Sequence, residues 1–230
     1  MSTVHDGHRG RVKKQFLKEG FSESTPDHKI LEMLLFYSIP RKDTNELAHK
    51  LIKTFGSFSN VLDATPEELM KVDGISENTA CLIKMLLPIY RRYKIDKQKD
   101  GVRLINRHLA ADYLESFFIG RTVETVYILC LDNKGRVLDC HLASEGDEIS
   151  VGISVRTVVE QAFKTHATAI MIGHNHPKGS ALPSHPDVIL TKAISTALLN
   201  LGIRFYDHVI YVENDYVSMA DSKEYAMMFN

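Results

Sequence analysis

The sequence predicts an α/β (α+β) protein in two parts, an all-helical amino-terminal domain and a carboxy-terminal mixed sheet flanked by helices. Three observations support this. Apolar residues recur at helical spacing from Pro26 to Tyr93. A charged stretch ending in glycine, residues 91–101, indicates a linker. Beyond it, runs rich in Val, Ile and Tyr alternate with helical patterns. We therefore expect domains at residues 1–100 and 101–230.

The amino-terminal helices are predicted from apolar faces and end signals. Four apolar residues between Ile30 and Leu35 fall on one face, and Pro40 is expected to end that helix just before it. Apolar residues repeat every four positions from Leu47 to Phe55. Thr65-Pro66 indicates a further helix start, with Thr as the cap and Pro in the first turn.

The segment Val72–Ala80 resembles a helix-hairpin-helix motif. In such motifs a glycine-rich hairpin presents backbone N–H groups to a DNA phosphate. Here Ser76 replaces the second hairpin glycine, and Asp73 and Glu77 add negative charge. A hairpin that only turns the chain is therefore an alternative of nearly equal weight.

The carboxy-terminal part is predicted to alternate helices and strands. The expected elements are a helix over 109–118, strands over 122–131 and 136–143 joined by a turn, a helix capped by Ser154, a buried strand over 167–173, a helix over 187–200 and a strand over 204–212.

The buried strand over 167–173 ends in two histidines, His174 and His176. Residues i and i+2 of a strand project from the same face, so both imidazoles can contact one object. Asp187 follows after a short loop, and two imidazoles, a carboxylate and a position left for water form a catalytic zinc ligand set. Ser184 to Asp187 is also a good helix start, but a helix cap does not explain the paired histidines.

The pattern His174-x-His176-Pro177, six residues, Ser184, two residues, Asp187 matches the JAMM (MPN+) metalloprotease motif without a gap. The chain resembles the RadC branch of that superfamily over nearly its whole length. The same resemblance extends to Gly7-His8-Arg9 and Pro40-Arg41-x-Asp43. It implies a JAMM/MPN-type domain, one Zn²⁺ ion held by His174, His176 and Asp187, and a peptide or isopeptide bond as the substrate.

The resemblance also implies a general base, a glutamate near the first strand of the domain, which accepts a proton from water. Glu124 is the matching position, and Glu145 is the competitor. Ser184 is expected to hydrogen-bond the tetrahedral intermediate, or else only to cap the helix. His185 fits the ligand spacing less well, and His208 is expected to support the ligands rather than to bind metal.

Zinc suits this chemistry because it lowers the pKa of bound water to about 7 and polarises a carbonyl group. Iron or manganese can also occupy a site of two histidines and a carboxylate. The cysteine pair of zinc deaminases and a His-Glu-x-x-His pattern do not occur in the sequence. Lys178 stands where the RadC branch usually has serine, so a substrate preference does not transfer with the motif.

Composition excludes other classes of protein. The formal net charge is −1, so no overall basic character indicates nucleic acid or membrane as a partner. The sequence contains no membrane-spanning apolar run and no signal-peptide pattern. The three cysteines lack Cys-x-x-Cys spacing and are predicted to be reduced and buried, namely Cys81, Cys130 and Cys140. These features predict a cytoplasmic protein.

Two functions are therefore expected. The first is a zinc metallopeptidase of the JAMM class. The second is a non-catalytic, DNA-associated or scaffolding module, since the RadC resemblance carries the label of a DNA-repair protein. In that second case, sequence-independent DNA contact is expected through residues 72–80.

Overall fold

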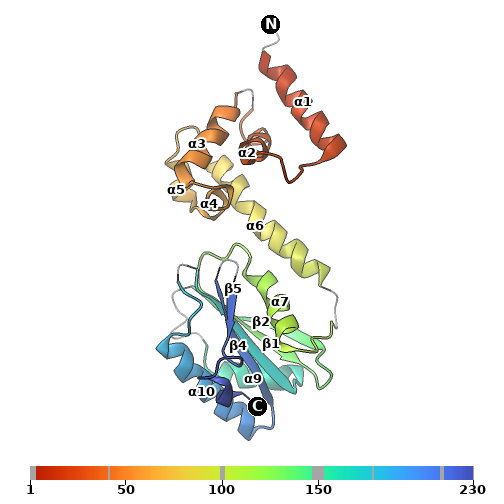
Figure 1. The fold of residues 1–230 in the computed structure, drawn as a ribbon, viewed down its shortest axis with the longest axis vertical. Coiled ribbons are helices and arrows are strands. Elements are labelled where there is room, and N and C mark those ends of the chain that lie inside the picture. Colours follow the sequence, from red (N-terminus) through yellow and green to blue (C-terminus); the bar gives the residue numbers. More distant parts are fainter. Residues whose placement is uncertain are drawn as a thin grey trace. The chain divides into compact units, whose positions relative to one another are not determined.

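The computed structural model describes residues 4–40, 42–98, 102–146, 153–177, 179–212 and 215–229. The chain divides into two compact units, Met1–Ile89 and Tyr90–Asn230 (Figure 1). The first unit is helical, and the second contains a mixed sheet with helices on both faces. The predicted fold class is therefore confirmed.

The elements of the first unit are α1 (Val4–Glu19), α2 (Asp27–Leu35), α3 (Asn45–Phe55), α4 (Phe58–Asp63), α5 (Pro66–Met70) and the first part of α6 (Glu77–Lys97). In this unit one apolar core is formed by residues from α2 to α6, and no described residue of α1 belongs to it. Thr65 caps α5, with Pro66 in the first turn, as predicted, and Glu68 completes a capping box with Thr65. Helix α2 ends at Leu35, earlier than predicted, because the following amides form the tighter i→i−3 bonds of a turn.

The stretch 91–101, predicted to be a linker, continues α6 as far as Lys97, and its role as a linker stays a prediction. Lys and Arg are good helix formers, and Arg92 pairs with Asp96 one turn later. Arg91 also donates a hydrogen bond to the carbonyl oxygen of Ile119 (2.9 Å), which fixes this part of the helix within the second unit.

The two compact units divide inside α6, between Ile89 and Tyr90. The domain ranges 1–100 and 101–230 stay a prediction. Cys81 also lies on this helix and is exposed, so its predicted burial is wrong. Ala80 and Ile83 face the core, and a turn of 100° per residue carries the intervening Cys81 outward.

The second unit contains a five-stranded sheet in the order β2-β1-β3-β4-β5. Its elements are α7 (Arg107–Phe118), β1 (Thr125–Leu131), β2 (Val137–Glu145), α9 (Val155–Thr165), β3 (Ala169–Asn175), α10 (His185–Asn200), β4 (Arg204–Val212), β5 (Asp215–Ser218) and the 3-10 turn η1 (Ala226–Met228). Strands β3 and β4 are parallel and are connected through α10, whereas the other neighbouring pairs are antiparallel.

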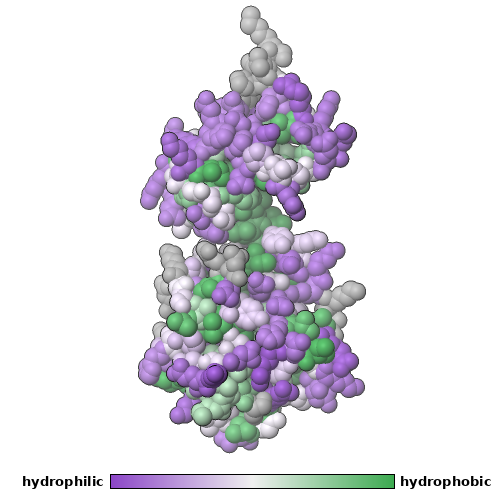
Figure 2. All heavy atoms as spheres, in the orientation of Figure 1, coloured by the Kyte–Doolittle hydropathy of each residue, from purple (hydrophilic) through white to green (hydrophobic). Residues whose placement is uncertain are grey.

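The two faces of the sheet carry different helices (Figure 1). On β1, Tyr127 and Leu129 pack with α7, whereas Ile128 and Cys130 pack with α9 and α10. This alternation follows from the two-residue period of a strand. Hydrophilic residues dominate the surface of both units seen in Figure 2, as expected when the apolar residues form cores.

Within the described part of the chain, no helix has the length and apolar character needed to cross a membrane. The cytoplasmic location inferred from the sequence stays a prediction.

Candidate metal centre

The register between β1 and β3 determines which residues meet at one end of the sheet. Val126 lies opposite His174 in this antiparallel pair. Continuing the register by two residues places Glu124, just before β1, beside His176, just after β3. Asn175 secures this end of the pair, because its side chain accepts a hydrogen bond from the Thr125 amide (2.8 Å).

The helix α10 supplies the carboxylate. His174 lies two and four residues after Ile172 and Ile170 on β3, so its side chain points to the same face of the sheet. Those two residues pack on the side covered by α9 and α10. Helix α10 begins on this side with a capping box between Ser184 and Asp187. Asp187 is therefore held in the first turn, with its side chain directed at the histidines.

The polar groups of the site converge closely. His174 Nε2 lies 2.9 Å from His176 Nε2. Asp187 Oδ1 lies 3.4 Å from His174 Nε2, and Asp187 Oδ2 lies 3.7 Å from His176 Nε2. A carboxylate oxygen of Glu124 and one ring nitrogen of each histidine all lie within 4.8 Å of one another. The structure thus brings together all three predicted metal ligands and the predicted base.

These donors fit a bound metal ion. Ligand bonds of about 2.0–2.1 Å in a tetrahedron place donor atoms about 3.3 Å apart, close to the observed 2.9, 3.4 and 3.7 Å. His176 Nδ1 lies 2.8 Å from the carbonyl oxygen of Ser180, which can only accept a hydrogen bond. Nδ1 of His176 therefore carries a proton, and Nε2 is directed toward His174 and Asp187. A cation satisfies such a cluster of acceptors.

Burial and neighbouring charge set the ionisation of the site. Burial lowers the pKa of the His174 ring far below its usual value, so the ring is neutral at pH 7. Burial by itself raises the pKa of Asp187, but the His174 ring and hydrogen bonds from Ser184 outweigh it, so the pKa is lowered. Burial raises the pKa of the Glu124 carboxyl group, and the nearby Asp187 adds to this effect.

Glu145, the competing candidate for the general base, is engaged by an arginine. Its carboxylate forms an ion pair with Arg121 (Nη1 to Oε1, 2.5 Å). Arg121 also donates to the hydroxyl group of Tyr127 (2.6 Å). His185 is exposed at the first position of α10, and Lys178 lies outside the described residues.

Three residues around the site were not predicted from the sequence. Asn175 fastens β3 to the start of β1, and Arg121 holds Glu145. Thr191 is fully buried on α10 and contacts His208. A signal for Thr191 is available in the sequence, since it follows Asp187 by four residues and so shares its helix face. Asn175 and Arg121 become recognisable only when the strand pairing is known.

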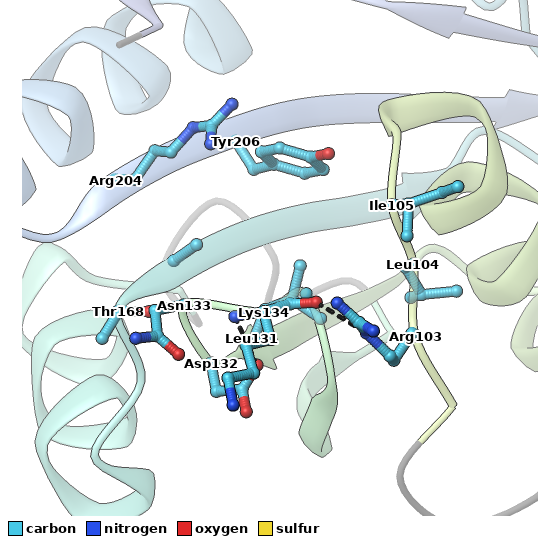
Figure 3. Close-up of a pocket in the computed structure, with 12 residues that line it drawn as sticks. Arg103, Leu104, Ile105, Leu131, Asp132, Asn133, Lys134, Thr168, Arg204 and Tyr206 are labelled. Atoms are coloured by element: carbon cyan, nitrogen blue, oxygen red, sulfur yellow. Dashed lines mark hydrogen bonds between the residues drawn. The ribbon is translucent and has the colours of Figure 1, made fainter.

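A cavity of about 480 Å³ lies at the other end of the strands (Figure 3). Its lining includes Arg103, Asp132 and Lys134, together with the residues that begin β3 and β4. Asp132 is already bound by the side chain of Arg136 (2.6 Å). None of the predicted site residues lines this cavity, so it is separate from the metal centre.

This mixed sheet between helices is a JAB domain, and the JAB domain belongs to the JAMM superfamily of metallohydrolases. The RadC-like JAB domain matches residues 104–225, which is more than half of the chain. The chain belongs to the RadC family.

Proteins similar to this chain occur in distant bacteria. A UPF0758 protein of Fusobacterium nucleatum is 30% identical over 224 residues, which cover 94% of this chain and 96% of that protein. A UPF0758 protein of Rhodobacter capsulatus is 31% identical, over 86% of this chain and 92% of its own length. One from Coprothermobacter proteolyticus is 30% identical, over 93% of this chain and 92% of its own. The similarity therefore includes the helical unit as well as the JAB domain.

Proposed function

We propose that this RadC-family protein is a zinc-dependent hydrolase that cleaves a peptide or isopeptide bond. The observation that carries the proposal is the convergence of the His174, His176 and Asp187 donor atoms, with the Glu124 carboxylate beside them. Two imidazoles and one carboxylate that leave further positions open are the ligand pattern of catalytic zinc rather than of structural zinc.

In this proposal His174, His176 and Asp187 hold one Zn²⁺ ion. Bound zinc supplies a Lewis acid and lowers the pKa of a water molecule to about 7. Asp187 Oδ2 accepts hydrogen bonds from the amide (2.7 Å) and the hydroxyl group (2.5 Å) of Ser184, which leaves Oδ1 directed at His174. Ser184 thereby orients the carboxylate ligand.

Glu124 is the proposed general base. Its carboxylate lies close to both histidines, where it could accept the proton of a water molecule on the bound ion. Glu124 takes the proton of the attacking water and delivers it to the amine that leaves. Glu145 is less suited to this role because Arg121 holds its carboxylate.

Metal content tests this proposal. Elemental mass spectrometry should find about one zinc ion per chain in the wild type, and none in H176A. H185A is the matched control, because His185 lies in the same segment, is exposed and is not a proposed ligand. H185A should keep its zinc. A folded wild-type protein that takes up no added zinc would overturn the hydrolase proposal.

A second proposal is DNA contact through residues 72–80. The supporting observation is that the hairpin is formed: Gly74 turns the chain at φ +100° and α6 begins at Glu77, with its first amides directed outward from the helix start. Backbone amides at a helix start can bind a phosphate without reading sequence.

A further inference from the structure

The imidazole of His208 lies between His174, a proposed metal ligand, and the hydroxyl group of Thr191 on α10. His208 Nε2 lies 2.9 Å from His174 Nδ1, and His208 Nδ1 lies 2.6 Å from Thr191 Oγ1. Thr191 Oγ1 in turn lies 2.6 Å from the carbonyl oxygen of Asp187. The side chains are sealed from solvent, with residue exposures of 2% for His174, 1% for His208 and 0% for Thr191. Because water does not reach these polar atoms, each one must form its hydrogen bond with a protein group.

The direction of every hydrogen bond in this row can be worked out. A carbonyl oxygen can only accept, so the single hydroxyl proton of Thr191 points at the carbonyl of Asp187. The sulfur of Met219, 3.6 Å from the same hydroxyl, is also only an acceptor, so it leads to the same result. Thr191 Oγ1 must then accept the hydrogen bond from His208, whose proton therefore lies on Nδ1.

The proton position on His208 in turn determines the tautomer of His174, the proposed metal ligand. A buried imidazole with no carboxylate bonded to it is neutral and has one N–H group, so Nε2 of His208 is an acceptor. His174 must donate to it from Nδ1 and consequently has an unprotonated Nε2. That atom is the one that faces His176 Nε2 at 2.9 Å and Asp187 Oδ1 at 3.4 Å.

We propose that Thr191 and His208 are positioning residues, a relay that fixes His174 as the Nδ1–H tautomer and so presents its Nε2 lone pair to the metal. The proposal rests on the proposed zinc site, although the tautomer is a property of the metal-free protein as well. Asp187 anchors both ends, since its carbonyl oxygen ends the relay while its carboxylate joins the site. The orientation of α10 thus determines both the position of the Asp187 carboxylate and the tautomer of His174.

The elements that meet in the relay explain why it holds its geometry. His208 lies opposite Ile172 in the parallel β3–β4 pair, so its ring reaches the strand that carries His174. Thr191 follows Asp187 by one helical turn and faces the sheet. Hydrogen-bonded partners of this kind orient a ligand imidazole and raise its basicity, and their loss typically weakens metal binding 10–100-fold.

The variants T191V and T191S test the relay. Valine keeps the shape of threonine without the hydroxyl group, whereas serine keeps the hydroxyl group. Long-range ¹⁵N–¹H correlation spectra of the metal-free protein report the tautomer of His174, whose signals are assigned as those missing from H174A. We expect the Nδ1–H form in the wild type and in T191S, and a mixture of tautomers in T191V. Zinc affinity, measured by competition with a chelator, should fall about 10–100-fold in T191V and stay close to the wild type in T191S.

Two results would overturn the relay. One is a wild-type His174 protonated on Nε2, a result that decides the matter by itself even if T191V fails to fold. The other is a folded T191V protein whose His174 tautomer and zinc affinity both equal those of the wild type. Failure of the zinc proposal would look different: the wild type would bind no zinc, while the tautomer spectra would continue to decide the relay.

Discussion

Ser184 and Asp187 bind each other in both directions. The hydroxyl group of Ser184 donates to Asp187 Oδ2 (2.5 Å) and also accepts a hydrogen bond from the Asp187 amide (3.3 Å). One residue pair therefore caps helix α10 and orients a proposed metal ligand. The sequence left open whether Ser184 caps the helix or hydrogen-bonds the tetrahedral intermediate. The geometry shows the cap and a bond to the Asp187 carboxylate, and the role toward the intermediate stays a prediction.

Replacing Ser184 by alanine separates the roles. We expect S184A to lose about 1 kcal/mol of unfolding free energy, because it removes a helix cap. We also expect zinc affinity to fall roughly 10-fold, because Asp187 loses its orienting partner. S154A is the matched control, since Ser154 caps α9 by the same bond to the amide of Thr157 (3.1 Å). It should lose similar stability and no zinc affinity. Equal zinc affinity in both variants would show that Ser184 only caps the helix and does not orient Asp187 for metal binding.

The two glutamates near the site should differ in their effects on turnover. E124Q should retain zinc and lose hydrolysis of any substrate found for the wild type, because an amide cannot accept the proton of water. E145Q should retain hydrolysis, because the side chain of Glu145 is engaged by Arg121. Zinc content and turnover measured on the same samples check this. Unchanged turnover in E124Q would remove Glu124 from the mechanism.

The three cysteines should react very differently with a thiol reagent. At pH 8, iodoacetamide should modify the exposed Cys81 first. Burial raises the pKa of Cys130 to about 11 and the pKa of Cys140 well above its usual value, so both thiols stay protonated and unreactive at that pH. Mass spectrometry of the peptides measures the labelling, and guanidinium chloride should expose all three. Labelling of Cys130 as fast as Cys81 in the native protein would contradict the structure.

DNA contact at the hairpin should respond to charge at the start of α6. Ser76 Oγ accepts a hydrogen bond from the Thr79 amide (3.4 Å), so this residue caps the helix. S76D and S76N both keep a good cap, but only aspartate places a negative charge where a phosphate would bind. If residues 72–80 contact DNA, the affinity of the full chain for duplex DNA should fall with increasing salt and should be several-fold weaker in S76D than in S76N. Equal binding by the two variants, or binding indifferent to salt, would count against this contact.

Much of the site was predictable because its signals are local. The buried run before His174, the two-residue spacing to His176 and the helix start at Ser184 predicted two imidazoles and one carboxylate that could meet. The periodicity of strands and helices is a property of the backbone, so it can be recognised without knowing the fold. Residues 91–97 are helical although they were expected in a linker, since a charged sequence is equally compatible with an exposed helix.

The types of the proposed ligands, their spacing and the order of the elements can be recognised in the sequence alone. Which of these groups converge follows from the tertiary contacts. The pairing of Val126 with His174 brings Glu124 to His176, and the carboxylate of Glu145 pairs with Arg121. The parallel pairing of β3 with β4 places His208 behind His174. These choices depend on strand register and on contacts between residues far apart in the chain, and neither is encoded in any local stretch of sequence.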